Sequence, residues 1–202
     1  VQWLSPAFPL GRFAYSHGLE AAVTARQVHD ATTLQGWLEA VLRFGSGRAD
    51  AVLLHAALRG DDADRLAGLA RALAACAERL EETEAQGAAL ARTVSALTGA
   101  EMPARPLPVA LGVAVRPLGL PPLRVVALYL HAFASNLTSC ATRFVPLGQT
   151  EAQAALARLA PAIATVARQT EGADPAQIAS AAFGADLAAM RHEALSVRIF
   201  KT

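Results

Sequence analysis

The sequence predicts an all-α protein, a single-domain helical bundle of about eight to ten helices. Hydrophobic residues make up 53% of the chain against 17% charged residues, and alanine, the strongest helix former, supplies much of the apolar share. Apolar residues recur at helical spacing in most segments. No alternating run is long enough to require a strand, and only residues 109–115 could be argued otherwise. At 202 residues the chain has the length of one domain, which we expect to span residues 1–202.

The N-terminal half begins with an extended or turning segment, residues 1–15. Pro6, Pro9 and Gly11 deny this segment a regular helix. Ser16 can then cap the first helix, because a serine side chain can accept a hydrogen bond from a free amide of the first turn. The helices expected in this half span residues 16–27, 33–44, 49–58, 63–79 and 81–97.

Glycine and proline are expected to set the breaks between these helices. Gly45 and Gly47 should separate the second helix from the third. The turn Gly60-Asp61-Asp62 should end the third helix, and its aspartates can cap the fourth. A proline-rich linker over residues 101–108 follows the fifth helix.

The C-terminal half is expected to be helical with three interruptions. The helices expected here span residues 109–115, 123–141 and 150–171, a short one starting at 174–175, and a last one starting at 183. Prolines within residues 117–122 and a loop over residues 143–149 separate the first three, and Pro161 should kink the third. The helix over 123–141 is the most apolar in the chain.

Composition and charge argue against several classes of protein. The net charge is +1 and there is no basic run, whereas nucleic-acid binders concentrate basic residues. The apolar helix 123–141 contains His131 and Asn136, which are costly in a bilayer without partners, so we expect no membrane span. Cys76 and Cys140 lie far apart without CxxC spacing, which indicates free thiols, and the first residues lack a signal-peptide pattern. We therefore expect a cytoplasmic protein.

The residue patterns contain no motif for catalysis or metal binding. No glycine spacing matches a P-loop or a dinucleotide-binding turn. His192-Glu193 begins like HExxH, but Ser196 stands where the second histidine should be. The histidines form no pair at a metal-ligand interval, so we expect no tightly bound metal and no cofactor. The competing hypothesis is a small helical enzyme in which His17 or His192 acts with Glu20 or Glu193 as an acid–base pair.

Two groups of residues are candidates for protein interfaces. Tyr129 and Phe133 lie four apart on the helix 123–141, so they share a face that either packs in the core or meets another subunit. The tail, residues 183–202, combines charged and aromatic side chains of the kind that anchor interfaces. These tail residues are Arg191, His192, Glu193, Arg198 and Phe200. Because chain termini are usually poorly ordered, we expect the tail to contribute little to folding.

Three segments resemble the signatures of one family. They read WLSPAFPLGRFAYSHGLE at residues 3–20, NLTSCATRFVPLGQ at 136–149 and DLAAMRHEALSVRIF at 186–200. In order and spacing they are similar to the UreF family of urease accessory proteins. The resemblance implies an all-α, dimeric, non-catalytic protein that binds the scaffold UreD (also called UreH) and the GTPase UreG. It further implies a role in delivering nickel to apo-urease, with the nickel handled by the assembly.

The resemblance also implies roles for individual residues. Carried over by motif, Arg191, His192, Glu193, Arg198 and Phe200 would bind a partner and become ordered only when UreD is bound. The second set, Tyr15, Ser16, His17 and Glu20, would form a polar surface near that assembly. Tyr129 with Phe133 is the expected dimer interface. The tail departs from the family pattern at Ala194, Leu195, Val197, Lys201 and Thr202.

Overall fold

The computed structural model describes residues 2–202, and within that range the chain is α-helical with no β-strand. The α-helices are α1 (Leu19–Thr24), α2 (Ala31–Phe44), α3 (Ser46–Arg59), α4 (Ala63–Ala72), α5 (Ala77–Thr98), α6 (Leu107–Val115), α7 (Pro122–Ala141), α8 (Gln149–Arg158), α9 (Ala160–Gln169) and α10 (Phe183–His192). Four short 3-10 helices accompany them: η1 (Gln2–Leu4), η2 (Arg12–Ala14), η3 (Arg116–Leu118) and η4 (Pro175–Gln177). The all-α prediction is confirmed, and residues 109–115 lie in α6.

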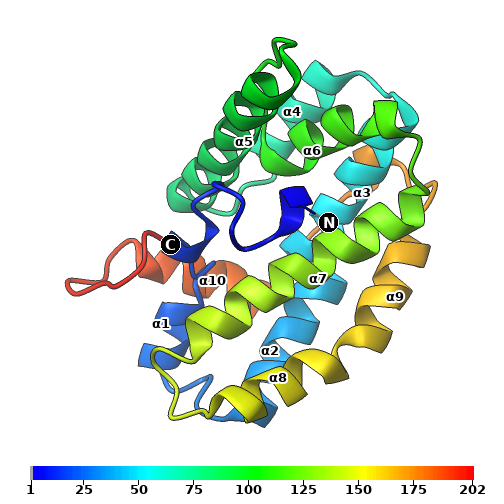
Figure 1. The fold of residues 1–202 in the computed structure, drawn as a ribbon. Helices are drawn as coiled ribbons and strands as arrows, with labels where there is room; N and C mark the ends of the chain where they lie inside the picture. Colours follow the sequence, from blue (N-terminus) through cyan, green and yellow to red (C-terminus); the bar gives the residue numbers. More distant parts are fainter. Residues whose placement is uncertain (1) are drawn as a thin grey trace.

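The long helix α7 crosses the face of the molecule seen in Figure 1, with α2, α8 and α9 beside it and α5 and α6 at the far end. Helix α3 lies behind α7 and packs against α2, α6 and α7. Helices α1 and α10 pack against each other, although they come from opposite ends of the sequence. The last residue therefore lies close to the N-terminal segment (Figure 1).

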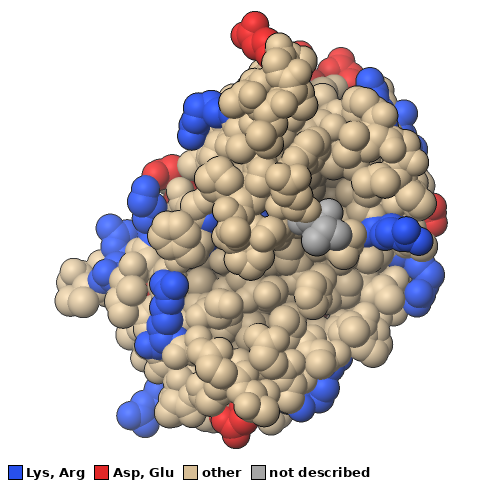
Figure 2. Space-filling view, viewed as in Figure 1, with Lys and Arg blue, Asp and Glu red and all other residues tan. Residues whose placement is uncertain are grey.

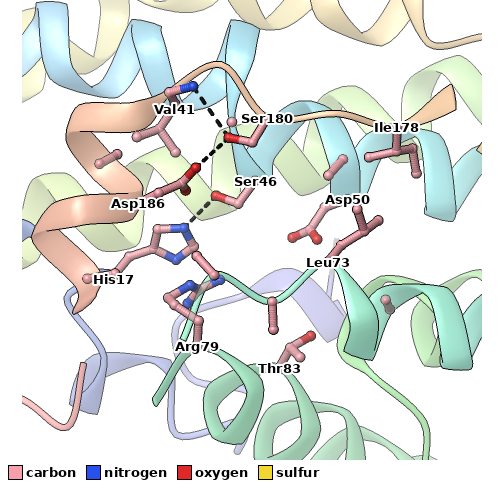
Figure 3. A pocket seen from close by; sticks show the side chains of 18 of the residues that line it. His17, Val41, Ser46, Asp50, Leu73, Arg79, Thr83, Ile178, Ser180 and Asp186 are labelled. Carbon is pink, nitrogen blue, oxygen red and sulfur yellow. Dashed lines mark hydrogen bonds between the residues drawn. The ribbon is translucent and has the colours of Figure 1, made fainter. Parts of the chain in front are cut away.

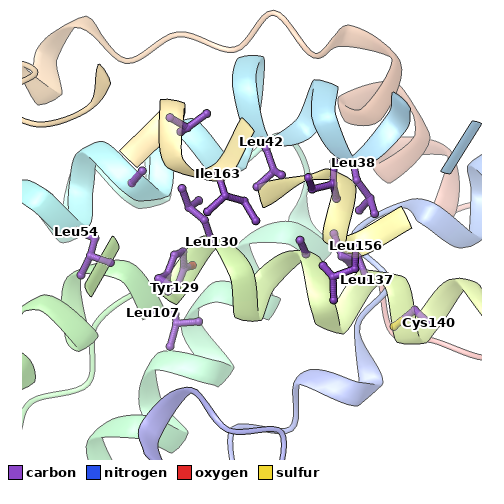
Figure 4. Close-up of a cluster of buried hydrophobic side chains, with 14 of the residues drawn as sticks. Leu38, Leu42, Leu54, Leu107, Tyr129, Leu130, Leu137, Cys140, Leu156 and Ile163 are labelled. Carbon is purple, nitrogen blue, oxygen red and sulfur yellow. The ribbon is translucent and has the colours of Figure 1, made fainter. Parts of the chain in front are cut away.

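The main hydrophobic core lies where α2, α7 and α9 meet (Figure 4). Leu38 and Leu42 of α2, Leu130 and Leu137 of α7, and Ile163 of α9 are all buried there. Burying each such side chain contributes about 2 kcal/mol relative to leaving it exposed. A smaller cluster of buried side chains joins α3, α4 and α6.

Two helix ends follow the capping residues that the sequence indicated, Gly60 and Asp62, and Asp30 sets a third. Asp30 accepts a hydrogen bond from the Thr33 amide (2.8 Å), and the Thr33 hydroxyl accepts one from the Asp30 amide, so α2 begins two residues earlier than predicted. Gly60, at φ 99°, ends α3 in the left-handed region. The Asp62 carboxylate caps α4 by accepting from two amides of its first turn.

The predicted boundary between the fourth and fifth helices is wrong. The expected helix 63–79 ends at Ala72, and α5 starts at Ala77 after an extended Cys76. Both helices contact α6. The turn over residues 73–76 redirects the chain, which lets α5 run along α6.

Two other breaks differ from the prediction. Gly47 lies inside α3, where a Cβ would come within 2.9 Å of the Leu42 Cα. Its lack of a side chain therefore serves close packing against α2 and does not end a helix. Pro161 divides the expected helix 150–171 into α8 and α9, because proline suits the first turn of a new helix and disrupts the interior of a continuous one.

No helix within residues 2–202 is both long enough and apolar enough to cross a bilayer. Helix α7 has the length of a span at 20 residues. Its buried face carries Val126, Leu130 and Leu137, and its opposite face includes the exposed His131 and Ser139. Helix α7 is therefore an amphipathic helix that packs against α2, α3 and α9.

Candidate functional site

The C-terminal tail is docked onto the N-terminal segment. The Ser16 amide donates a hydrogen bond to the Thr202 carbonyl (2.6 Å), and the Lys201 amide donates one to the Ala14 carbonyl (2.8 Å). The Ser16 hydroxyl also donates to the Thr202 carbonyl. These bonds satisfy the backbone groups of both segments within the chain itself.

Close contact between α1 and α10 brings the two segments together. Gly18 precedes α1 at φ 80°, and a Cβ at this position would come within 2.6 Å of the Ala189 amide nitrogen. Only glycine fits both the left-handed backbone and this short approach. The Ser16 hydroxyl accepts a hydrogen bond from the Glu20 amide (3.2 Å) and so supports the first turn of α1.

The Glu20 carboxylate holds the tail. It is buried, and its two oxygens accept hydrogen bonds from the Ile199 amide (2.8 Å) and the Phe200 amide (3.0 Å). The second oxygen also lies 3.1 Å from Nε2 of His192. A buried carboxylate is stable when hydrogen bonds satisfy it, and Glu20 has three such partners.

His192 links Glu20 to α5. The imidazole is 0% exposed, and its Nδ1 lies 2.6 Å from the Glu78 carboxylate. Glu78 also pairs with Arg198 of the tail. Polar and charged groups from α1, α5, α10 and the tail therefore meet around the buried imidazole of His192.

Glu82, one turn further along α5, completes this arrangement. Its carboxylate accepts hydrogen bonds from the Thr202 hydroxyl (2.9 Å) and from the Gln86 amide group (3.2 Å), and it pairs with Arg79. Phe200 packs against Phe144, with ring centroids 5.0 Å apart. We call this set of groups the terminal clasp. It comprises Ser16, Glu20, Glu78, Glu82, His192, Arg198 and the backbone of residues 199–202.

The terminal clasp differs from two expectations from the sequence. We expected a tail ordered only by UreD, and the structure gives the tail contacts of its own with the N-terminal segment, α1 and α5. Tyr15, Ser16, His17 and Glu20 do not form a polar surface, because all four are buried beneath the tail and α10. Among the tail residues, Arg191, Glu193 and Arg198 are exposed, whereas His192 and Phe200 are buried.

A pocket of about 70 Å³, lined by apolar side chains together with His17, Ser46, Asp50 and Arg79, adjoins the terminal clasp (Figure 3). Nε2 of His17 lies 2.5 Å from the Ser46 hydroxyl, and Nδ1 has no hydrogen-bond partner among the described residues. Burial, reinforced by nearby Arg79, holds the pKa of His17 well below its usual 6.5. His17 also has a positive φ of 61°, which is uncommon for a non-glycine residue.

Tyr129 lies on the inner side of this region and not on the surface. Its hydroxyl donates a 2.6 Å hydrogen bond to Asp50, and its ring is buried beneath Arg12. Burial raises the pKa of Asp50 and also that of Tyr129. This corrects the assignment of Tyr129 to a dimer interface, because its side chain has no surface to offer a second copy. Phe133 is partly buried and packs edge-on against His17.

The acid–base pairs of the enzyme hypothesis are not placed for catalysis. His192 and Glu20 do lie in contact, but both are sealed beneath the tail. Glu193 contacts the Glu78 amide (3.1 Å) and not a histidine. A general acid or base must reach the proton that it transfers. Within residues 2–202, no group of three or more His, Cys, Asp or Glu side chains is placed to hold a metal ion.

Sequence reasoning missed the residues of α5 and α3 that complete the site. These are Glu78, Arg79 and Glu82 of α5, and Ser46 and Asp50 of α3. One signal was present: Glu78, Glu82 and Gln86 recur every four residues, so they share a single helix face. The spacing did not show that this face is buried, because solvent-exposed helix faces carry the same spacing.

The fold and the site together define a class of protein. The polar groups of this helical chain bind its own two ends together, and exposed apolar side chains lie on the tail and α10, as in proteins that act through interfaces. The profile of the UreF family matches residues 28–160. The urease accessory protein UreF of Cereibacter sphaeroides is 63% identical over 202 residues, covering 100% of this chain and 96% of the relative. Those of Jannaschia sp. and Paracoccus denitrificans are each 52% identical, covering 100% of this chain and 92% and 94% of theirs.

The chain therefore belongs to the UreF family of urease accessory proteins. It is accordingly a non-catalytic accessory protein. The family profile leaves out residues 1–27 and 161–202, which supply most of the terminal clasp. The curated relatives cover those segments as well.

Proposed function

We propose that the chain is a scaffold in urease maturation that bridges UreD (UreH) and the GTPase UreG during nickel delivery to apo-urease. On this proposal the chain positions or modulates the GTPase, and nucleotide hydrolysis belongs to UreG. Nickel passes through the assembly without a tight site on this chain. Membership of the family supports the proposal in general terms, and the placement of the tail supports it in detail.

The observation that carries the proposal is the exposure of apolar side chains on a tail that is firmly held. Val197 and Ile199 are 82% and 65% exposed. The tail is held at this point because the Glu20 carboxylate accepts hydrogen bonds from the amides of Ile199 and Phe200, and the Arg198 side chain pairs with Glu78. A preorganised apolar loop loses little entropy when a partner covers it. We assign this loop to the binding of UreD.

Helix α10 extends the same apolar character. Phe183, Leu187 and Met190 are exposed at spacings of four and three residues, so they form one stripe along the helix. Arg191 follows Leu187 by four residues and lies at the end of this stripe. We propose that α10 and the tail together form the partner-binding region. Arg191, Glu193 and Arg198 are its exposed polar residues, and His192 and Phe200 support it from within.

We propose that the chain forms a homodimer through the exposed side of α7. The face in Figure 2 is nearly free of charged side chains at its centre, with Lys, Arg, Asp and Glu gathered at the margins. Leu123 and Leu128 of α7 and Phe13 of the N-terminal segment are exposed large apolar residues on elements of this face. The interface thus moves from Tyr129 to its neighbour Leu128, which points outward. A cytoplasmic location, supported by the free thiols of Cys76 and Cys140, is part of the same proposal.

The test is co-purification of the chain with UreD and UreG homologues. Val197→Ser combined with Ile199→Ser should weaken UreD binding at least tenfold and leave the melting temperature unchanged, because both side chains are exposed. The matched control is Leu97→Ser, which removes an exposed apolar side chain of α5 (60% exposed) away from the tail. Wild-type chain that retains neither UreD nor UreG would refute the scaffold function.

A further inference from the structure

The surface around the tail carries a local excess of positive charge. Arg143, Arg191, Arg198 and Lys201 are exposed there. Only Arg198 has a carboxylate partner within 4.0 Å among the described residues, namely Glu78. The net charge of the whole chain is only +1. The excess of positive charge is therefore local to this part of the surface. Figure 2 shows Lys and Arg predominating along the edge that holds α1 and the end of the chain.

Aromatic rings hold two of these cations in place. The Arg143 guanidinium lies 5.3 Å from the centroid of the Phe200 ring, and the Lys201 ammonium lies 6.0 Å from that of Tyr15. A cation above an aromatic face is positioned by the ring quadrupole, and its charge is not neutralised. Both rings are buried, Tyr15 in the N-terminal segment and Phe200 in the tail. The contacts that dock the tail therefore also fix the position of these charges.

Most acidic groups of the same region are engaged within the chain. Glu20 and Glu78 are satisfied within the terminal clasp. Glu193 accepts a hydrogen bond from the first turn of α5, and Asp186 accepts one from Ser180 (2.6 Å). Glu81 of α5 is exposed near Tyr15, at the margin of this surface. Within residues 191–201 and Arg143, the exposed charged side chains without such a bond are therefore basic.

We propose that this surface, comprising residues 191–201 and Arg143, docks a protein whose contact face carries aspartates and glutamates around an apolar centre. Val197 and Ile199 enter that centre, and the cations pair with the surrounding carboxylates. The inference rests on the proposed function, because the partner is the protein that binds the tail. Basic charges at the rim of an interface mainly raise the association rate and select the partner.

The test measures affinity for the UreD homologue at low and high salt. Between 50 mM and 500 mM NaCl we expect affinity to fall about tenfold or more, because screening weakens rim charge pairs. Arg191→Glu should lower affinity at low salt by a similar factor and slow association, and Arg191→Gln should have a smaller effect. The control is Arg92→Glu, which reverses an exposed, unpaired arginine on α5 and should change nothing.

The outcomes separate this inference from the function on which it rests. Binding that is lost in the Val197 and Ile199 variant but is insensitive to salt and to Arg191→Glu would overturn the acidic partner and leave the scaffold function standing. Tight association with vesicles of anionic lipid, combined with salt-insensitive UreD binding, would assign the charges to a membrane surface and also overturn it. Absence of any UreD binding by the wild-type chain would remove both proposals.

Discussion

Nε2 of His192 lies 3.1 Å from the carboxylate of Glu20, although 172 positions of sequence separate the two residues. This contact joins α10 to α1, and the same carboxylate holds the amides of Ile199 and Phe200. The tail, α10 and the N-terminal segment thus depend on one buried acid. Glu20 and His192 were expected to meet a partner directly, and they instead hold the proposed partner-binding surface in shape.

Removing the Glu20 carboxylate should release the tail. Glu20→Ala leaves two backbone amides and one ring nitrogen without partners, and a buried unsatisfied group costs about 1–3 kcal/mol. We expect the free energy of unfolding to fall by about 3 kcal/mol or more, and trypsin to cut faster after Arg198 and Lys201. Glu39→Ala is the control, since that carboxylate pairs only with Arg43 in a part-exposed position. Unchanged cleavage in the Glu20 variant would show that the tail is held by other contacts.

The buried part of the tail should contribute to folding, contrary to the expectation from the sequence. Phe200 is buried against Phe144, and replacing a buried phenylalanine with alanine typically costs about 3–5 kcal/mol. Phe200→Ala and deletion of residues 196–202 should both lower the melting temperature and UreD binding together. The Val197 and Ile199 variant should lower binding alone. A deletion that left the melting temperature unchanged would restore the view of a tail that contributes little to folding.

Gly18 offers a test of the packing between α1 and α10. Gly18→Ala adds a methyl group 2.6 Å from the Ala189 amide nitrogen, at φ 80°. Gly119→Ala is a matched control, because Gly119 also has a positive φ of 61° but has open space around it. Backbone strain alone should cost both variants about 1 kcal/mol. We expect Gly18→Ala to cost clearly more in urea unfolding, and equal losses would mean that α10 moves aside freely.

The sequence predicted most helices because their signals are local. Asp62 can be identified as a cap, and Gly60 as a helix end, from the residues on either side of them. Where the prediction failed, the deciding contact was between two helices. Gly47 was expected to break a helix, but it lies inside α3 and allows close packing against Leu42 of α2. The turn before α5 places that helix against α6. Local chemistry does not encode such contacts.

The candidate site was predictable in part for the same reason. The signature motifs identified His192 and Glu20, but nothing in the sequence indicates that the two touch. Glu78 lies in the first turn of α5, where the helix dipole favours an acidic residue in any protein, and Glu82 follows one turn later. Their partners His192 and Thr202 lie more than 100 positions away. A surface role for Glu20 was therefore as consistent with the sequence as a buried one.

His17 should make the stability of the chain depend on pH. Its pKa in the folded chain lies well below 6.5, because burial and Arg79 disfavour the imidazolium. In the unfolded chain the same imidazole takes up a proton near pH 6.5. Between these two values the unfolded chain binds more protons, so the free energy of unfolding rises with pH across this window. Acidification from pH 7 should therefore destabilise the folded chain.

The comparison is between the wild type and His17→Asn, measured by urea unfolding from pH 7.5 to pH 5. Asparagine tolerates the positive φ of this position and does not titrate. Other groups also titrate, among them Asp50, whose raised pKa has the opposite sign because the folded chain then holds the extra proton. Because both chains share those groups, the difference between them isolates His17. We expect the wild type to lose stability more steeply as pH falls, and parallel curves would show that His17 is not held neutral by burial.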